Sequence, residues 1–320
     1  MSKKIPKISV VIFTKNEEQN IGDCIKSAKS FASEIIVVDM QSKDQTVHIA
    51  KSKGAMVYPV EDYNWVEPVR NFGISKAKNE WILVLDADER VPSTLAKKFI
   101  EVVNENKFDA VRTPYKVVFF GKWIKHTHWW PDYHIRFFRR GHVKWIVKIH
   151  PDIKVSGRIL ELKAEVKNAI IHENARDIKT WLKKIDHHTD FEDYFFNLKD
   201  VKVEDILGRF RREFYWRYFE SKGYLDGMHG FVLSKFMEFY RFLEFTKYWE
   251  KNGYREIADP KQLCQAIEKQ WGLNGESIKE IEERNGILKA QLDSIMLSKT
   301  FKIWQGYCNL RDRIKKFLFG

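Results

Sequence analysis

The first 110 residues alternate between strand-like and helix-like segments, and this alternation constrains the fold more strongly than any other feature of the chain. Short apolar runs predict strands at residues 8–13, 35–38, 55–60 and 81–85. Amphipathic runs predict helices at residues 17–31, 44–53, 68–78 and 92–106. Repeated strand–helix units are typical of an α/β fold with a mostly parallel sheet and right-handed crossovers.

Polar and acidic residues stand directly after three of these predicted strands. Residues 14–17 (Thr-Lys-Asn-Glu) follow the first strand, Asp39 follows the second, and residues 86–88 (Asp-Ala-Asp) follow the fourth. Ligands of open parallel sheets bind beyond the carboxyl ends of the strands. We therefore expect these residues to form one binding site.

Asp86 and Asp88 suggest a metal. They follow an apolar run, and side chains alternate along an extended chain, so both carboxylates can point the same way. Two carboxylates held so close repel each other unless a cation lies between them. Oxygen ligands suit Mg²⁺ or Mn²⁺, which bind through one or two carboxylates plus substrate phosphates. The alternative is that these acids only cap the helix that follows Pro92.

Asp39 indicates a nucleotide as the bound ligand. An acid at this strand end, about 25 residues after Thr14, commonly binds a ribose hydroxyl or a base N–H. Residues 14–18 contain no glycine, which excludes the G-x-G-x-x-G cradle of dinucleotide-binding folds. A diphosphate must then be bound in another way, and a metal held by residues 86–88 is the obvious candidate. The alternative for residues 39–46 is an ordinary capped turn.

Four arginines are candidates for contacts with the expected nucleotide ligand. Arg70 lies on the predicted helix 68–78, where it either reaches the nucleotide or is a solvated helix charge. Arg136, Arg139 and Arg140 form a basic strand with aromatic neighbours. We interpret these three as ligands of donor phosphates, with a solvated sheet edge as the alternative.

Composition limits the class of protein. The chain is 44% hydrophobic, which supports a sizeable core and excludes a disordered protein. A net charge of +12 indicates an anionic partner such as a nucleotide, nucleic acid or phospholipid. The three cysteines are far apart and form no disulfide framework, so a reducing, cytosolic setting is expected. No apolar stretch approaches the roughly 18 residues of a membrane span.

The pattern changes after about residue 109. Short β-type runs alternate with basic and aromatic clusters up to residue 172, and we interpret them as strands and loops that cover the acceptor side. From residue 177 onward the chain is predicted to be helical. The expected domains are an α/β domain at 1–175, a helical and possibly membrane-associating extension at 176–258, and a helical or coiled-coil tail at 259–320.

Three N-terminal motifs resemble the family 2 glycosyltransferases of the GT-A fold. They are Ser9–Glu18, Glu34–Asp39 with its following turn, and Leu83–Arg90. The resemblance implies a nucleotide-sugar donor, usually UDP-linked, a divalent metal (Mn²⁺ or Mg²⁺) and inversion at the anomeric carbon. By motif position, three residues would hold the nucleoside: Thr14, Glu17 and Asp39. Two would hold the ribose or diphosphate and the metal: Asp86 and Asp88. The full set of nucleotide-binding candidates is Thr14, Asn16, Glu17, Asp39, Ser42, Arg70, Asp86 and Arg136.

Two later motifs, Gly121–Arg140 and Gly223–Phe231, resemble the bacterial lipopolysaccharide-core β-1,4-glucosyltransferase subgroup. With them, the resemblance covers about residues 7–251. The histidines between residues 126 and 172 lack the spacing of a zinc site, so zinc is not expected.

An inverting transfer needs a carboxylate that takes the proton of the acceptor hydroxyl. Asp132 follows two tryptophans and a proline, where aromatic walls would raise its pKa by desolvation. A turn aspartate is the alternative. The subgroup usually has His-Glu where this chain has His150-Pro151-Asp152, so Asp152 is the second candidate. We predict Asp132 in preference to Asp152.

Two basic segments rich in aromatic residues, at about 205–222 and 301–319, indicate an anionic membrane surface as a partner. The alternative is that both segments pack on the enzyme. Between them, residues 278–295 carry a three–four apolar spacing that predicts either a coiled-coil homo-oligomer or intramolecular packing.

The sequence therefore predicts a metal-dependent, inverting glycosyltransferase. It would act on a cell-envelope glycan or a lipid-linked acceptor such as lipopolysaccharide core, on the inner face of the cytoplasmic membrane. A sugar nucleotidyltransferase is one alternative, although residues 14–18 lack the Gly-rich basic loop that it needs. A basic nucleic-acid-binding protein is another, but the acidic residues 86–89 argue against a nucleic-acid partner.

Overall fold

The computed structural model describes residues 7–146, 153–191 and 202–272, together with residues 283, 286–291, 293–294, 302 and 305. Contacts divide the chain into two compact units, Met1–Phe196 with Arg209–Tyr254, and Asn197–Gly208 with Arg255–Gly320. The first unit holds the sheet and all the candidate site residues that the structure describes.

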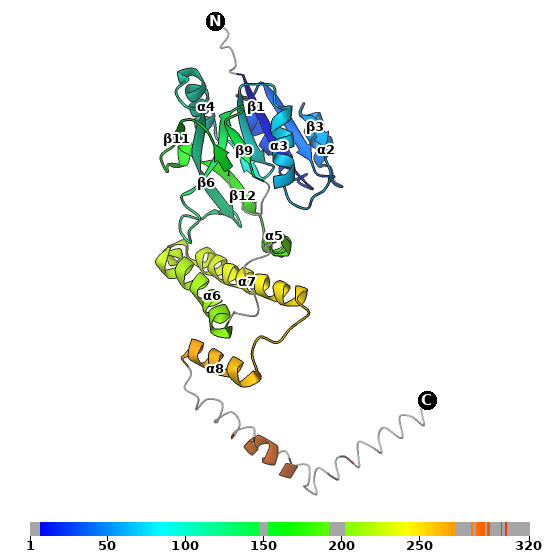
Figure 1. Cartoon of the computed structure of the whole chain (residues 1–320), viewed down its shortest axis with the longest axis vertical. Helices are drawn as coiled ribbons and strands as arrows, with labels where there is room; N and C mark the ends of the chain where they lie inside the picture. Colours follow the sequence, from blue (N-terminus) through cyan, green and yellow to red (C-terminus); the bar gives the residue numbers. More distant parts are fainter. Residues whose placement is uncertain are drawn as a thin grey trace, which may run out of the picture. The chain divides into compact units, whose positions relative to one another are not determined.

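One half of the main sheet is entirely parallel, with the strand order β3-β2-β1-β4 (Figure 1). Its strands are β1 (Ile8–Thr14), β2 (Glu34–Asp39), β3 (Met56–Pro59) and β4 (Trp81–Asp86). The helices of this region are α1 (Ile21–Ala28), α2 (Thr46–Ser52), α3 (Glu67–Lys76) and α4 (Ser93–Glu105). These bounds confirm the predicted alternation of strands and helices.

The other half continues the same sheet from β4 in the order β8-β6-β12-β5. β8 runs antiparallel to both of its neighbours, whereas β6 and β12 are parallel to each other. Its strands are β5 (Glu89–Arg90), β6 (Ala110–Phe119), β8 (Asp132–Arg139) and β12 (Ile170–Ala175). Short strands β7 (Lys122–Trp123) and β11 (Ile159–Glu161) pair with β6, while β9 (Val143–Trp145) pairs with β10 (Ile153–Val155). Apart from β9 and β10, which form a separate two-stranded sheet, the described strands after residue 109 extend the main sheet. The fold therefore confirms the predicted mixed α/β class.

β1 is buried on both faces, which explains its uninterrupted apolar sequence. Val10 and Ile12 belong to one core, which also contains buried residues of α1 and α4. Val11 and Phe13 belong to a second core, to which α3 contributes Val69. The sheet is thus covered by helices on both sides, so its strand ends are held rigidly.

The chain is helical from residue 178 through most of the remaining described part, as predicted. The helices are α5 (Ile178–Phe191), α6 (Val203–Tyr215), α7 (Met228–Lys251) and α8 (Pro260–Trp271). A π turn (Trp216–Glu220) and a short 3₁₀ helix, η3 (Gly223–Asp226), connect α6 to α7. Among the described residues, none of the helices has both the length and the apolar character that crossing a bilayer requires.

The predicted aromatic stripe at 205–222 is divided between packing and exposure. Phe210 packs against Phe242 of α7, with ring centroids 5.6 Å apart, and Phe214 lies 6.1 Å from Phe231. Tyr215 and Phe219 are instead about half exposed. Half of the segment 278–295 and nearly all of the segment 301–319 lie outside the described residues.

Candidate active site

Strand register brings the first site residues together. Thr14 lies opposite Asp39 in the β1–β2 pair, and Phe13 lies opposite Asp86 in the β1–β4 pair. The carboxyl ends of three adjacent parallel strands therefore place Thr14, Asp39 and Asp86 at one edge of the sheet, as the strand-end argument predicts.

Asn16 and Ser42 join the two loops that follow β1 and β2. The backbone N–H of Asn16 donates to the Ser42 hydroxyl (2.8 Å), and the N–H of Lys43 donates to the Asn16 side chain (2.7 Å). The N–H of Glu17 donates in the same way to Thr46 (2.7 Å). These bonds hold the loops in place, so Asn16 and Ser42 shape the site through the backbone.

The two carboxylate oxygens of Asp39 have different surroundings. Its Oδ2 accepts the N–H of Ser42 (3.1 Å), which is the capped turn foreseen as the alternative. Its Oδ1 and the Oγ1 of Thr14 are both buried and have no hydrogen-bond partner among the described residues. Buried polar atoms nearly always have partners, so these two atoms are available to a ligand.

Two arginines hold Asp86. Nη2 of Arg70 lies 3.2 Å from Oδ1, and Nη2 of Arg136 lies 3.2 Å from Oδ2. Burial alone would raise the pKa of Asp86, but the charges of the two guanidinium groups lower it below its usual value. Arg70 is only 4% exposed and lies over the Phe13 ring, so the alternative of a solvated helix charge is wrong.

Asp88 is held by residues that come much later in the chain. Nζ of Lys184 on α5 lies 2.7 Å from its Oδ2, and Nε2 of His172 on β12 lies 3.5 Å from the same atom. Burial would raise the pKa of Asp88, but Lys184 and His172 lower it well below its usual value. The helix-capping alternative fails, because α4 begins without a side-chain cap.

A divalent metal fits this pair of acids. Both carboxylates are ionised, as metal ligation requires, and they offer hard oxygen atoms. Within the described ranges no cluster of three or more His, Cys, Asp or Glu side chains is arranged around a metal position. A metal at Asp86 and Asp88 would therefore complete its coordination with water and with oxygens of a bound phosphate.

Sequence analysis missed several members of the site. Glu89 is 1% exposed, accepts the N–H of Asp86 (3.0 Å) and lies 3.5 Å from Arg136. Burial raises the pKa of Glu89 above its usual value. The hydroxyl of Tyr115 accepts from Nε of Arg136 (3.0 Å). The acidic run containing Glu89 was visible in the sequence, but no local pattern indicates that Tyr115, His172 or Lys184 joins it.

Asp132 is the first residue of β8, opposite Tyr115. Its Oδ2 lies 2.9 Å from Nε2 of His134. Burial alone would raise the pKa of Asp132. The hydrogen bond to His134 and the charges of nearby histidines outweigh burial, so the pKa of Asp132 lies below its usual value. The expectation of a raised pKa was therefore wrong, because a histidine stands where only aromatic walls were foreseen. Asp152, the second candidate, lies outside the described residues.

The three arginines of β8 do not act together. Arg139 lies opposite Trp81 at the beginning of β4, and Arg140 donates to the backbone oxygen of Asn79. Arg136 points toward Asp86 at the other end of that strand. The prediction of a phosphate-binding triplet is therefore wrong for Arg139 and Arg140, since an antiparallel strand carries them to the opposite edge of the sheet.

The motif Gly223–Phe231 fixes the loop that precedes Asp132. The buried carboxylate of Asp226 accepts the backbone N–H groups of Lys125 (3.3 Å) and His126 (2.7 Å). Gly230 is required because a Cβ there would lie 1.8 Å from the carbonyl oxygen of Gly223. The helical connection thus holds the aromatic loop 125–130 against the sheet.

Unpaired polar atoms and ionised carboxylates at the ends of parallel strands are typical of nucleotide-binding α/β enzymes. Residues 9–154 match the profile of a family described as glycosyl transferase family 2. The match supports a family 2 glycosyltransferase domain over these residues, and the predicted enzyme class, a glycosyltransferase, is confirmed.

Several known proteins are similar to this chain. An uncharacterized glycosyltransferase from Rickettsia conorii is 28% identical, covering 77% of this chain and 91% of its own. Another from Rickettsia typhi is 45% identical, but that alignment spans only 28% of this chain and 30% of the relative. Among solved structures, Staphylococcus aureus TarS 1–349 in complex with UDP is 15% identical, with a TM-score of 0.41, covering 79% of this chain and 94% of that chain.

Proposed function

We propose that this chain is an inverting, metal-dependent glycosyltransferase. It moves a sugar from a nucleotide-sugar donor, UDP-linked as the resemblance implies, to a cell-envelope glycan or a lipid-linked acceptor such as lipopolysaccharide core. The observation that carries the proposal is one sheet edge that joins the unpaired atoms of Thr14 and Asp39 to the ionised Asp86 and Asp88. The first pair suits the polar edge of a nucleoside, and the second suits a diphosphate bound through a divalent cation.

Each half of the donor has its own residues in this proposal. Oδ1 of Asp39 accepts a base N–H or a ribose hydroxyl, and Oγ1 of Thr14 adds a second polar contact. Asp86 and Asp88 hold Mn²⁺ or Mg²⁺. When bound, the metal neutralises the diphosphate and stabilises it as a leaving group.

The acceptor side supplies the base. Asp132 lies beside Tyr115, whose ring also contacts His134 and His172, with centroids 4.7 and 6.0 Å apart. His172 in turn lies 3.5 Å from Asp88, so the side chains of Tyr115 and His172 connect Asp132 to the proposed metal-binding carboxylates. We propose that Asp132 takes the acceptor proton, with Asp152 as the second candidate.

Calorimetry against UDP-, GDP- and CDP-sugars, each with and without Mn²⁺, tests the proposal. We expect one nucleotide class to bind, more tightly when Mn²⁺ is present. Binding of none of these donors, with or without the metal, would overturn the proposed function.

We also propose peripheral attachment to the inner face of the cytoplasmic membrane. The segment from the end of α6 to the start of α7 exposes Tyr215 (54%), Phe219 (49%), Leu225 (58%) and Met228 (71%), and Lys222 is exposed among them. Aromatic and basic side chains in this combination suit an anionic bilayer surface. Flotation with anionic liposomes at low salt is expected, and a protein that stays in the soluble fraction there would exclude the attachment. A homo-oligomer through the C-terminal segments remains a prediction.

A further inference from the structure

Lys184 occupies the carboxylate that the proposed metal would need. Its Nζ lies 2.7 Å from Oδ2 of Asp88 and donates to the backbone oxygen of Asn174 at 2.6 Å. The side chain of Asp88 is 9% exposed, and that of Lys184 is 28% exposed. The ammonium group is thus a close, partly buried counter-charge for Asp88.

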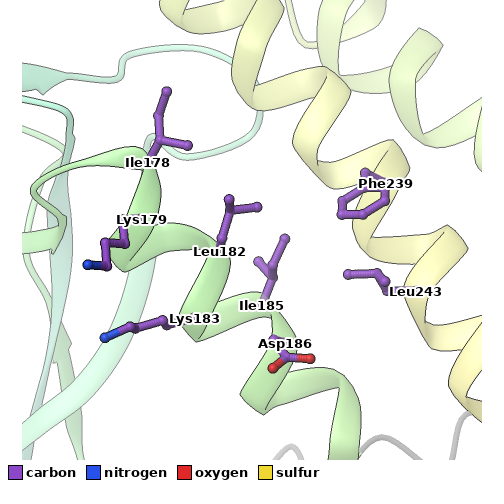
Figure 2. Close-up of a pocket in the computed structure, with 8 residues that line it drawn as sticks. All are labelled: Ile178, Lys179, Leu182, Lys183, Ile185, Asp186, Phe239 and Leu243. Carbon is purple, nitrogen blue, oxygen red and sulfur yellow. The ribbon is translucent and has the colours of Figure 1, made fainter. Parts of the chain in front are cut away.

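The rest of α5 is fixed, so the backbone of Lys184 has a defined position. Trp181 packs edge to face on Phe119 of the sheet, with centroids 5.0 Å apart. On another side of the helix, Leu182 and Ile185 face α7 across an apolar groove of about 540 Å³ (Figure 2). The flexible four-carbon stem of Lys184 can adopt another conformation while the backbone of α5 stays in place.

A divalent cation bound at Oδ2 of Asp88 would compete with this ammonium group for that oxygen atom. A metal would bind a carboxylate oxygen at roughly 2.0–2.2 Å. With Nζ already 2.7 Å from Oδ2, two positive centres would lie side by side in a partly buried position and repel each other. His172, at 3.5 Å from the same oxygen, leaves still less room.

We propose that Lys184 is a built-in counter-cation of Asp88 that is displaced when metal and nucleotide bind together. This inference rests on the proposed function. The incoming diphosphate gives the released ammonium group a new anionic partner, so metal and nucleotide bind cooperatively, whereas the metal alone binds weakly. Lys184 thereby acts as a positioning residue that couples the two ligands and keeps the site free of metal until a donor arrives.

Lys184→Gln tests the inference, because glutamine keeps a donor for the oxygen of Asn174 but removes the charge. Mn²⁺ binding is measured from the spin-resonance signal of the free ion, with and without UDP. We expect the variant to bind Mn²⁺ alone about tenfold more tightly than the wild type, and UDP to improve Mn²⁺ binding less than it does in the wild type. Lys184→Arg keeps the charge and is expected to retain weak binding of Mn²⁺ alone.

Lys183→Met is the matched control. It removes a neighbouring lysine that lines the groove of Figure 2, and it is expected to leave Mn²⁺ binding unchanged. In an Asp88→Asn background, the gain from Lys184→Gln is expected to disappear, which separates a contact with Asp88 from a general loss of positive charge. Lys184→Met provides a second neutral variant if Lys184→Gln does not fold.

The outcomes distinguish this inference from the function on which it rests. If the wild type binds UDP with Mn²⁺ but Lys184→Gln and Lys184→Met bind Mn²⁺ no more tightly than the wild type, the inference is overturned alone. If the wild type binds no nucleotide, the proposed function falls and the inference falls with it.

Discussion

The two halves of the sheet contribute to the site in different ways. In the parallel half, the site residues are the last residues of strands or follow them directly, as Thr14, Asp39 and Asp86 do. In the other half, Arg136 and His172 come from within strands β8 and β12. The first half supplies the carboxylates and the unpaired polar atoms, together with Arg70, whereas Arg136, His172 and the Lys184 of α5 supply the other charges that lower the pKa values of these carboxylates.

The residues at the parallel strand ends are the proposed ligand contacts, whereas the residues from later in the chain adjust the pKa values of the carboxylates. Parallel strands run in the same direction, so their carboxyl ends lie together however far apart the strands are in the sequence. Arg70 reaches Asp86 from 16 residues away, but two other cations reach the site through an antiparallel return and a late helix, across 50 residues for Arg136 to Asp86 and 96 for Lys184 to Asp88. The electrostatics of the site therefore depend on long-range pairing, whereas its position depends on strand order.

Asp88→Ala is expected to give the largest effect. It removes a proposed metal ligand at the parallel edge, so turnover should fall on the order of 10³-fold or more. The partly exposed Lys184 can be solvated after the change, so the fold should survive. Turnover with Mn²⁺ and the melting temperature are measured together. Undiminished Mn²⁺-dependent turnover in a folded variant would remove Asp88 from the metal site.

Asp132→Asn tests the base in the other half of the sheet. Asparagine preserves the shape but cannot take the proton, so turnover should fall on the order of 10²- to 10³-fold with donor affinity unchanged. Normal turnover here, together with loss in Asp152→Asn, would identify Asp152 as the base. Activity in both variants would exclude both.

The pH profile sharpens the same prediction. The pKa of Asp132 lies below its usual value, so the carboxylate is ionised throughout the neutral range. Activity should be present above that pKa and lost only as the pH falls through it, below the usual range of an aspartate carboxyl. An acid limb near pH 6 in kcat/KM would contradict Asp132 as the base.

Arg136→Met and Arg139→Met compare the two ends of β8. The first removes a partner of Asp86 and leaves the buried Glu89 without its arginine, so the protein should lose about 3–5 kcal/mol of stability and bind donor more weakly. The second removes a bond to the exposed Glu80 and should leave donor affinity unchanged. Chemical denaturation and donor titration measure both. Equal effects on donor affinity would mean that the two ends of the strand do not differ as described.

Asp39→Ala is expected to have the smallest effect. Loss of one hydrogen bond to the nucleoside should weaken UDP about tenfold while leaving turnover at saturating donor close to normal. Unchanged UDP affinity would remove Asp39 from the nucleotide site.

The sequence predicted the parallel half well, because the period of its apolar residues and the polar residues after each strand are local signals. Thr14, Asp39 and Asp86 were found in this way. The sequence did not predict that Arg136 would be separated from Arg139 and Arg140. The direction of β8 depends on its pairing with β4 and β6, which the local sequence of β8 does not indicate. Nor did it predict His134 beside Asp132, which reverses the expected pKa shift.

The central claim is that one sheet edge binds a nucleotide diphosphate and a metal. A crystal structure of the protein with UDP and Mn²⁺ tests it most directly. We expect the nucleoside beside Thr14 and Asp39, the diphosphate and Mn²⁺ at Asp86 and Asp88, and Nζ of Lys184 moved away from Asp88. A nucleotide bound elsewhere, or Mn²⁺ that contacts neither Asp86 nor Asp88, would contradict the account.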